Sequence, residues 1–233
     1  MKLLSINASN TKINKSQKSA DTPTRIASLS LSLYPDNKTC PGAKAAGCME
    51  GCLVSAGRGR FDNVASARRA KTDYWHNDQA GFLAQLRQEL TNFDKLCART
   101  NVRGVVRLNT ISDIAWEKYD IPQSFPDLYF YDYTKVVKRV GNTPANYDLI
   151  FSYSGRDQYQ NQVKQLPANK PMAVVFQNSL PARFLGKKVI DGDKSDLVNV
   201  NAGGKIIGLL AKGKAKKDNS GFTVNLIQTL EVA

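Results

Sequence analysis

Three of the four cysteines stand close together in the sequence, and they offer the most specific chemistry in the chain. Cys40, Cys48 and Cys52 follow the spacing C-x7-C-x3-C in a stretch rich in Gly, Ala and Pro. Thiolate ligands suit zinc and iron–sulfur clusters. Three cysteines can hold a [4Fe–4S] cluster that keeps one iron open. Zinc with a fourth ligand is one alternative, although structural zinc sites usually have shorter spacings. A loop without metal is the other.

Polar side chains come directly after several short apolar runs. The candidate catalytic residues among them are Asn109, Asp113, Asp132, Lys135, Tyr153 and Arg156. The candidate cofactor-binding residues are Ser112, Tyr131, Ser154 and Asp191. If the runs are parallel strands, these side chains meet at the carboxyl edge of a sheet, where α/β proteins bind ligands. There they could hold a polar cofactor or a phosphate, or transfer protons. The alternative is that they only form turns after the strands.

Basic residues follow the cysteine stretch and are candidates for nucleic-acid contacts. They are Arg58, Arg60, Arg68, Arg69 and Lys71. Arginine makes bidentate contacts to phosphate groups. Tyr74 and Trp75 come shortly afterwards and could stack on bases. The alternative is a solvated helix face with Trp75 in the core.

The composition favours a polyanionic partner. The 233 residues include 33 Lys and Arg against 20 Asp and Glu, which gives a net charge of +13. This bias favours nucleic acid or a nucleotide, with a generally basic surface as the alternative. The single histidine, His76, excludes metal sites built on two histidines. No apolar run approaches the roughly 20 residues of a membrane span, and the N-terminus lacks the apolar core of a signal peptide. We therefore expect a cytoplasmic protein.

Two helices are predicted after the cysteines. The first covers residues 62–76. The second begins at Asn77 or Asp78 and ends near Arg99, and its apolar residues repeat every 3.6 positions. They are Phe82, Leu83, Leu86, Leu90, Phe93, Leu96 and Cys97. Because Cys97 lies in this stripe, we expect a buried thiol there rather than a fourth metal ligand.

Short apolar strands make up most of the remaining chain. The first strand covers residues 25–34 and precedes the cysteines. Six further apolar runs cover residues 104–108, 128–130, 147–151, 172–176, 188–190 and 206–210. Strands this apolar are typical of a parallel sheet with both faces covered. The predicted fold class is α/β, with a mostly parallel sheet or an incomplete (β/α) barrel and a cysteine loop after the first main strand.

The two ends of the chain depart from this pattern. Residues 1–24 are polar and basic, which predicts a flexible arm before a single α/β domain of residues 25–233. Residues 222–227 alternate between apolar and polar types and predict an antiparallel edge strand. The lysines before this tail are expected in a basic hairpin turn. They are Lys212, Lys214, Lys216 and Lys217.

Several short motifs occur together in this chain. They are Leu31-Ser32-Leu33, Cys40-Pro41-Gly42-Ala43 with Cys48 and Cys52, Ala67-Arg68-Arg69-Ala70-Lys71-Thr72, Val106-Arg107-Leu108-Asn109 with Ser112-Asp113, Tyr131-Asp132-Tyr133-Thr134-Lys135, Ser152-Tyr153-Ser154 and Ala211-Lys212-Gly213-Lys214. Over about residues 28–217, the chain thereby resembles a family of bacteriophage proteins named after gene product 88. That resemblance implies a phage origin rather than a mechanism.

At a greater distance, three cysteines after a first strand resemble the radical S-adenosylmethionine enzymes, although the usual spacing there is C-x3-C-x2-C. This second resemblance implies that Cys40, Cys48 and Cys52 are cluster ligands and that S-adenosylmethionine is a cofactor.

The features together favour a phage-encoded iron–sulfur protein that acts on or near nucleic acid, as a radical-type enzyme or its degenerate descendant. One alternative is a non-catalytic module that binds nucleic acid or a host protein, with the cysteines as a structural site. The weaker alternative is a magnesium-dependent nuclease built on Asp113, Asp132 and Asp191.

Overall fold

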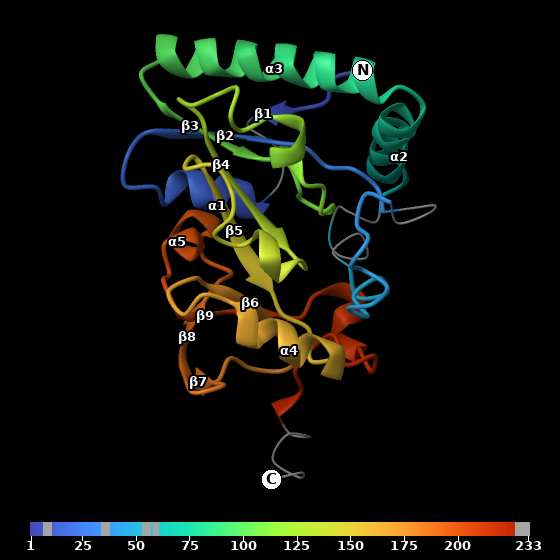
Figure 1. The fold of residues 1–233 in the computed structure, drawn as a ribbon, viewed down its shortest axis with the longest axis vertical. Coiled ribbons are helices and arrows are strands. Elements are labelled where there is room, and N and C mark those ends of the chain that lie inside the picture. The colour runs from blue at the N-terminus through green and yellow to red at the C-terminus, as the bar shows by residue number, and fades with distance from the viewer. Residues whose placement is uncertain (7–10, 34–37, 53–56, 58–60, 227–233) are drawn as a thin grey trace. The chain divides into compact units, whose positions relative to one another are not determined.

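The sheet is the main element of the fold. The computed structural model describes residues 1–6, 11–33, 38–52, 57 and 61–226 (Figure 1). Within these residues the strands follow the order β1-β2-β3-β4-β5-β6-β9-β8-β7. Their bounds are β1 Ser5–Ile6, β2 Thr24–Ser28, β3 Arg103–Arg107, β4 Tyr129–Thr134, β5 Tyr147–Ser152, β6 Met172–Phe176, β7 Arg183–Phe184, β8 Lys187–Asp191 and β9 Ile206–Leu210.

Most neighbouring strands run in the same direction. Parallel pairs join β2 to β3, β3 to β4, β5 to β6, β6 to β9 and β9 to β8. Antiparallel pairs join β1 to β2 and β7 to β8. The predicted α/β class with a mostly parallel sheet is therefore confirmed, as is the position of the cysteines after the early strands.

Helices occur between the strands. The α-helices are α1 Thr11–Lys18, α2 Asp62–Asn77, α3 Gln79–Arg99, α4 Asp157–Gln165 and α5 Asp196–Val200, and the 3-10 helices are η3 Trp116–Tyr119, η4 Val137–Arg139 and η5 Gly213–Lys217. The two predicted helices match α2 and α3 closely. In the part of the chain that the structure describes, no helix combines the length and the apolar character that a bilayer span requires.

The chain forms two compact units, which we describe separately. Unit 1 consists of Met1–Cys40, Phe61–Asp132 and Thr143–Asp148, and unit 2 consists of Pro41–Arg60, Tyr133–Asn142 and Leu149–Ala233. The single domain expected for residues 25–233 stays a prediction.

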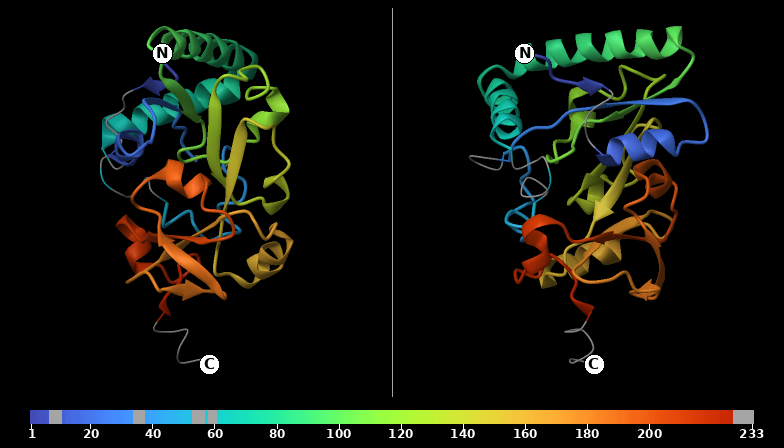
Figure 2. Two further views of the ribbon diagram at one scale, coloured as in Figure 1. Left: turned by 90° about the vertical axis from the view of Figure 1, so that its left-hand side faces the viewer. Right: turned by 180° about the vertical axis from the view of Figure 1, so that it is seen from behind.

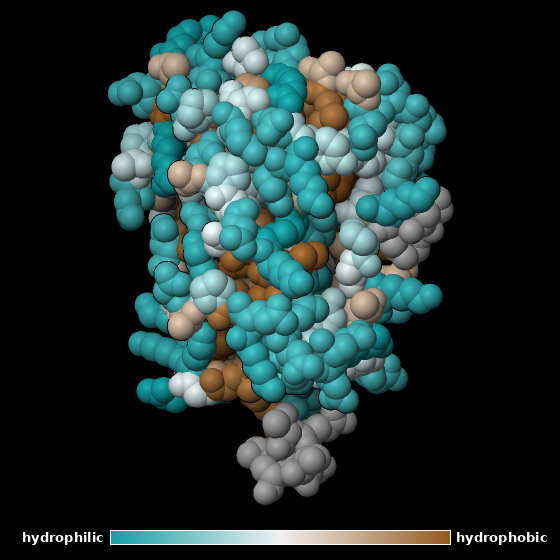
Figure 3. Space-filling view, in the orientation of Figure 1, coloured by the Kyte–Doolittle hydropathy of each residue, from teal (hydrophilic) through white to brown (hydrophobic). Residues whose placement is uncertain are grey.

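Helix α3 covers one side of unit 1, where Figures 1 and 2 show it beside β1 and β3. Five residues of the predicted stripe are buried, namely Phe82, Leu86, Leu90, Phe93 and Cys97. The side chain of Asp78 caps the helix by accepting the Gly81 N–H at 2.8 Å. Burial raises the pKa of the Cys97 thiol, which agrees with the predicted core thiol. The outer surface of α3 is mostly hydrophilic (Figure 3).

The N-terminal segment of unit 1 is packed against α3. Residues 1–24, predicted to be a flexible arm, contain β1, α1 and the start of β2. Leu3, Leu4 and Ile13 are buried. The carboxylate of Glu89 in α3 accepts the N–H of Leu3 at 2.9 Å and that of Leu4 at 2.7 Å. A few apolar residues thus fix a stretch whose average composition is polar.

The first predicted strand is shorter than residues 25–34, because β2 ends at Ser28. Leu29, Leu31 and Leu33 are buried as expected. Beyond β2, however, side chains satisfy the backbone of Ser32: its N–H donates to the Thr72 hydroxyl at 2.8 Å, and its carbonyl accepts the Thr39 hydroxyl at 2.7 Å. Leu29 continues the bonding to β3, since its N–H donates to the Arg107 carbonyl at 2.9 Å, whereas the backbone of Ser32 pairs with side chains. Position 34 lies outside the described residues.

The tail of unit 2 runs in the direction opposite to our prediction. Val224 forms a parallel bridge with Phe176 at the end of β6. Its N–H donates to the Val175 carbonyl at 2.8 Å, and its carbonyl accepts the Gln177 N–H at 2.9 Å. The predicted antiparallel edge strand is wrong over its described part, because alternation of residue types carries no information on direction. Residue 227 lies outside the described part. The expected basic hairpin turn is the 3-10 helix η5 instead.

Candidate functional site

The candidate residues of unit 1 form a buried polar network at the end of β3. The Asn109 N–H donates to Asp132 Oδ1 at 2.7 Å, and Asn109 Nδ2 donates to Asp132 Oδ2 at 3.3 Å. Asn109 Oδ1 accepts bonds from Ser112 Oγ at 2.8 Å, from the Ile114 N–H at 2.9 Å and from Trp116 Nε1 at 3.2 Å. Such complete pairing suits groups that hold a loop in place.

The other two unit 1 candidates are also buried. The Asp113 N–H donates to the Thr39 carbonyl at 2.8 Å, and Asp113 is 7% exposed. Tyr131 has no exposed surface, and the Arg107 guanidinium lies 5.8 Å from the centre of its ring. Trp75, considered for base stacking, packs edge-on against Phe82 and Trp116 in the same unit. The alternative reading of Trp75 as a core residue is therefore the correct one.

The candidates of unit 2 surround residues 42–47 of the cysteine loop. Arg156 Nε donates to the Ser220 carbonyl at 2.7 Å, and its terminal nitrogen reaches the Ala45 carbonyl at 3.3 Å. Ser154 Oγ donates to the Ala46 carbonyl at 2.8 Å. Gly47 has a φ of 69°, and a Cβ there would lie 2.7 Å from Arg156 Nε. Ser154 and Arg156 therefore hold the backbone of the loop in place through hydrogen bonds to its carbonyl groups.

Lys135 and Tyr153 lie in the same neighbourhood. Lys135 Nζ donates to the Tyr153 carbonyl at 2.9 Å, and the ammonium lies 4.8 Å from the centre of the Phe222 ring. Burial raises the pKa of Tyr153. Its hydroxyl accepts a bond of 2.9 Å from Gln160. The structure thus groups Lys135, Tyr153, Ser154 and Arg156 in unit 2, whereas Asn109, Ser112, Asp113, Tyr131 and Asp132 belong to unit 1.

The three cysteines predicted as metal ligands are distributed over both units. Cys40 belongs to unit 1, and Cys48 and Cys52 belong to unit 2. The Cys48 sulfur lies 3.6 Å from the Ala43 carbonyl oxygen, within the distance of a weak hydrogen bond. Among the described residues, no three Cys, His, Asp or Glu side chains form a group that could hold a metal ion. The cluster, its zinc alternative and S-adenosylmethionine stay predictions, and no step below depends on them.

The basic residues predicted to contact nucleic acid, which lie before and within α2, differ in accessibility. Arg58 and Arg60 lie outside the described residues. Lys71 Nζ donates to the Leu3 carbonyl at 2.7 Å, and burial lowers the pKa of this lysine. Lys71 therefore ties the N-terminal segment to α2, while Arg68 is half-buried and Arg69 is exposed.

An open cleft of about 570 Å³ lies in unit 2 at the carboxyl ends of β6, β9 and β8. Its lining residues are Gln177, Asn178, Asp193, Leu210, Ala211, Lys212 and Lys216. The three strands are neighbours and parallel, so their carboxyl ends share an edge. The strand order stops following the chain between β6 and β9, which is the point where α/β sheets place ligands. Gln177 and Asn178 follow an apolar run like the other candidates, and this signal could have identified them.

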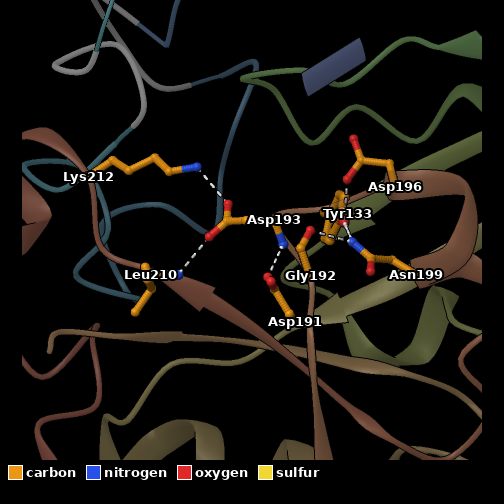
Figure 4. A network of polar contacts seen from close by, with 8 residues as sticks. All are labelled: Tyr133, Asp191, Gly192, Asp193, Asp196, Asn199, Leu210 and Lys212. Carbon is orange, nitrogen blue, oxygen red and sulfur yellow. Dashed lines mark hydrogen bonds and ion pairs between the residues drawn. The ribbon is translucent and has the colours of Figure 1, made fainter. Parts of the chain in front are cut away.

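Asp193 links the strand ends in this cleft (Figure 4). Its carboxylate accepts the Leu210 N–H at 3.1 Å and Lys212 Nζ at 2.6 Å. The candidate Asp191 accepts the N–H of Asp193 at 2.9 Å, which shapes the turn after β8. At Gly192 a Cβ would lie 2.2 Å from Ile207 Cγ2, so glycine lets this turn pass close to β9.

A second set of bonds holds the far side of the same turn. Tyr133 donates to Asp196 Oδ1 at 2.7 Å, and Asn199 Nδ2 donates to the Gly192 carbonyl at 2.9 Å. Asp196 and Asn199 have no exposed surface. This side is therefore held by buried groups, whereas the side chains of Asp193 and Lys212 are 25% and 49% exposed.

Searches of curated proteins and of solved structures found no match. The sequence model described as gene product 88 matches residues 2–226, which is nearly the whole chain. The distant likeness to radical S-adenosylmethionine enzymes has no such support. The chain therefore belongs to the gene product 88 family.

Proposed function

We propose that this protein binds nucleic acid through the phosphate backbone, in the cleft at the carboxyl ends of β6, β9 and β8. The observation that carries the proposal is the cleft lining, which brings Lys212 and Lys216 together with Asn178 around one open space. Ammonium and amide N–H groups are the donors that contact phosphate and sugar oxygens.

The charge around the cleft supports this assignment. Lys212, Lys214, Lys216 and Lys217 are all exposed, on and beside η5. The nearby carboxylate of Asp218 already accepts four hydrogen bonds from Ser220 and Thr223. The net charge of +13 over the whole chain adds long-range attraction for a polyanion.

The chemistry of the lining favours backbone contacts over base stacking. The described residues that line the cleft include no aromatic side chain, and stacking platforms for single strands depend on such side chains. They include one carboxylate, Asp193, whereas metal-assisted cleavage needs several ligands for its cation. The proposal is therefore binding, with no catalytic step.

A salt titration tests the proposal. Binding of a fluorescein-labelled duplex DNA of about 25 base pairs would be measured by polarisation from 50 to 300 mM KCl, with duplex RNA and single strands in parallel. We expect the Lys212→Gln, Lys216→Gln double variant to bind the duplex about tenfold more weakly. The slope of log K against log salt should fall by about two, because two phosphate contacts are lost.

The matched control removes the same charge from the opposite ends of two of the same strands. Lys187 begins β8 and Lys205 precedes β9, so Lys187→Gln with Lys205→Gln leaves the cleft intact. Equal weakening in both double variants would reduce the effect to a general basic surface and overturn the proposed site. Absence of binding by the unaltered protein to duplex DNA, duplex RNA and single strands alike would overturn the function itself.

A further inference from the structure

The cleft contains an anion of its own, and this feature suggests how access to it is controlled. Resting on the proposed function, we infer that the Asp193 carboxylate occupies an anion site formed by the Leu210 N–H and the Lys212 ammonium. A phosphate group of the nucleic acid binds there by displacing that carboxylate. Asp193 is thus an internal competitor for the phosphate.

The donors around Asp193 are those that a phosphate requires. One carboxylate oxygen accepts the Leu210 N–H at 3.1 Å, and the other accepts Lys212 Nζ at 2.6 Å. Figure 4 shows both donors approaching the carboxylate from the same side. A backbone N–H together with an ammonium, each bonded to a different oxygen of one anion, is a common way of binding phosphate.

The sheet explains why this backbone N–H is available. The pairing of β8 with β9 ends at Asp191 and Gly208, and the Gly192 N–H still donates to the Gly208 carbonyl at 2.8 Å. The Leu210 N–H lies beyond this last contact and donates to the Asp193 carboxylate instead of to a carbonyl of β8. The Asp193 side chain satisfies it in the place of a strand.

Asp193 can leave the site more easily than its neighbours can. The Asp193 and Lys212 side chains are 25% and 49% exposed, and ion pairs this exposed are weak. The Asp193 N–H bond to Asp191 holds the backbone of the turn and not the departing carboxylate. Asp196, by contrast, is fully buried and bonded to Tyr133, so it stays in place during the exchange.

This arrangement favours a polyanion over a small anion. A single phosphate gains the bonds to the Leu210 N–H and to Lys212 that Asp193 already makes, so the exchange gives it little advantage. A nucleic acid strand places further phosphates near Lys216 and the neighbouring exposed lysines, which offsets the loss of the internal pair. The carboxylate therefore excludes free phosphate while it admits nucleic acid.

The Asp193→Asn variant tests the inference. The amide keeps an acceptor for the Leu210 N–H and removes the competing charge. We expect it to bind the duplex about fivefold more tightly than the unaltered protein at the same salt concentration, and to bind inorganic pyrophosphate measurably by calorimetry. Asp157→Asn removes one exposed carboxylate from unit 2 and should change binding by less than about twofold, with circular dichroism confirming that both variants are folded.

The outcomes separate this inference from the proposed function. Duplex binding that is weakened by Lys212→Gln and not strengthened by Asp193→Asn would retain the function and overturn the competitor role. Absence of duplex binding in every form would overturn both. If Asp193→Asn does not fold, amide NMR of the unaltered protein decides the question. A shift of the Leu210 resonance on duplex addition supports displacement, and binding without such a shift overturns it.

Discussion

Asn109 and Asp132, which are 23 residues apart, are joined through both the backbone and the side chain of the asparagine, with bonds of 2.7 and 3.3 Å. Tyr147 adds a third bond to the same carboxylate at 3.0 Å. Asp132 is 1% exposed, so its oxygens serve these partners inside unit 1. This pairing fixes the loop between Asn109 and Trp116 onto β4.

Replacing Asp132 should therefore reduce stability rather than nucleic-acid binding. Asp132→Ala leaves the Asn109 N–H and the Tyr147 hydroxyl buried without their acceptor, which costs about 2–4 kcal/mol of unfolding free energy. Urea denaturation followed by circular dichroism measures this loss. Asp127→Ala removes an exposed carboxylate of the same unit and should change stability by less than about 0.5 kcal/mol. Equal effects of the two variants would contradict the assigned role.

Glu89 should determine whether the N-terminal segment stays attached to α3. Glu89→Ala removes the acceptor of the Leu3 and Leu4 N–H groups, so we expect these two amides to exchange with D₂O at least tenfold faster. The loss of unfolding free energy should be about 1–2 kcal/mol. Gln88→Ala changes the exposed neighbour in the same helix and should leave the exchange unchanged. Unaltered protection at Leu3 and Leu4 in Glu89→Ala would argue against this anchor.

The elements were largely predictable from the sequence, because helices and strands repeat their apolar residues at fixed intervals. The stripe from Phe82 to Cys97 predicted the buried face of α3, and a start at Asn77 or Asp78 agrees with the observed cap at Asp78. The same reasoning did not identify Leu3, Leu4 and Ile13, which are too few to form a pattern but are buried. The direction of the tail around Val224 relative to β6 was not predictable, since parallel and antiparallel strands show the same alternation of residue types.

The partners of the candidate residues were not predictable, because they come from distant parts of the chain. Arg156 looks like a ligand-binding residue after a strand, yet it bonds to the Ala45 carbonyl 111 positions away. A polar residue that holds a loop has the same sequence signature as one that faces a cleft. The Leu210 N–H, a main contact of Asp193, has no side-chain signature at all.

Protonation of Asp218 at low pH should reduce the free energy of unfolding, because this carboxylate is hydrogen-bonded in the loop beside the cleft. Burial raises the pKa of Asp218, but hydrogen bonds from Thr223 and Ser220 outweigh burial, and the pKa lies below 3.8. The folded state therefore holds the ionised form more strongly than the unfolded state does. The resulting stability is fully present above pH 3.8 and is lost as the pH falls through the lowered pKa.

The measurement compares Asp218→Asn with the unaltered protein. The unfolding free energies should differ by about 1 kcal/mol at pH 7, since Asp218 is partly exposed, and the difference should shrink in thermal melts below pH 3.8. Asn219→Ala, at the exposed neighbouring position, should show no such trend. A difference that is constant down to pH 2 would rule out the assigned hydrogen bonds as its source.

Metal removal should leave nucleic-acid binding intact, because the proposed contacts are ammonium, amide and backbone N–H groups of the cleft. Protein isolated anaerobically would be divided, and one half treated with ferricyanide and EDTA to remove iron–sulfur clusters and zinc. We expect both halves to bind the duplex within about twofold of each other. Iron, sulfide and zinc analysis of the untreated half, repeated with Cys48→Ser, tests the three-cysteine prediction separately. Loss of binding on treatment, together with iron that disappears in Cys48→Ser but remains in Cys97→Ser, would instead place a cluster at the centre of the function.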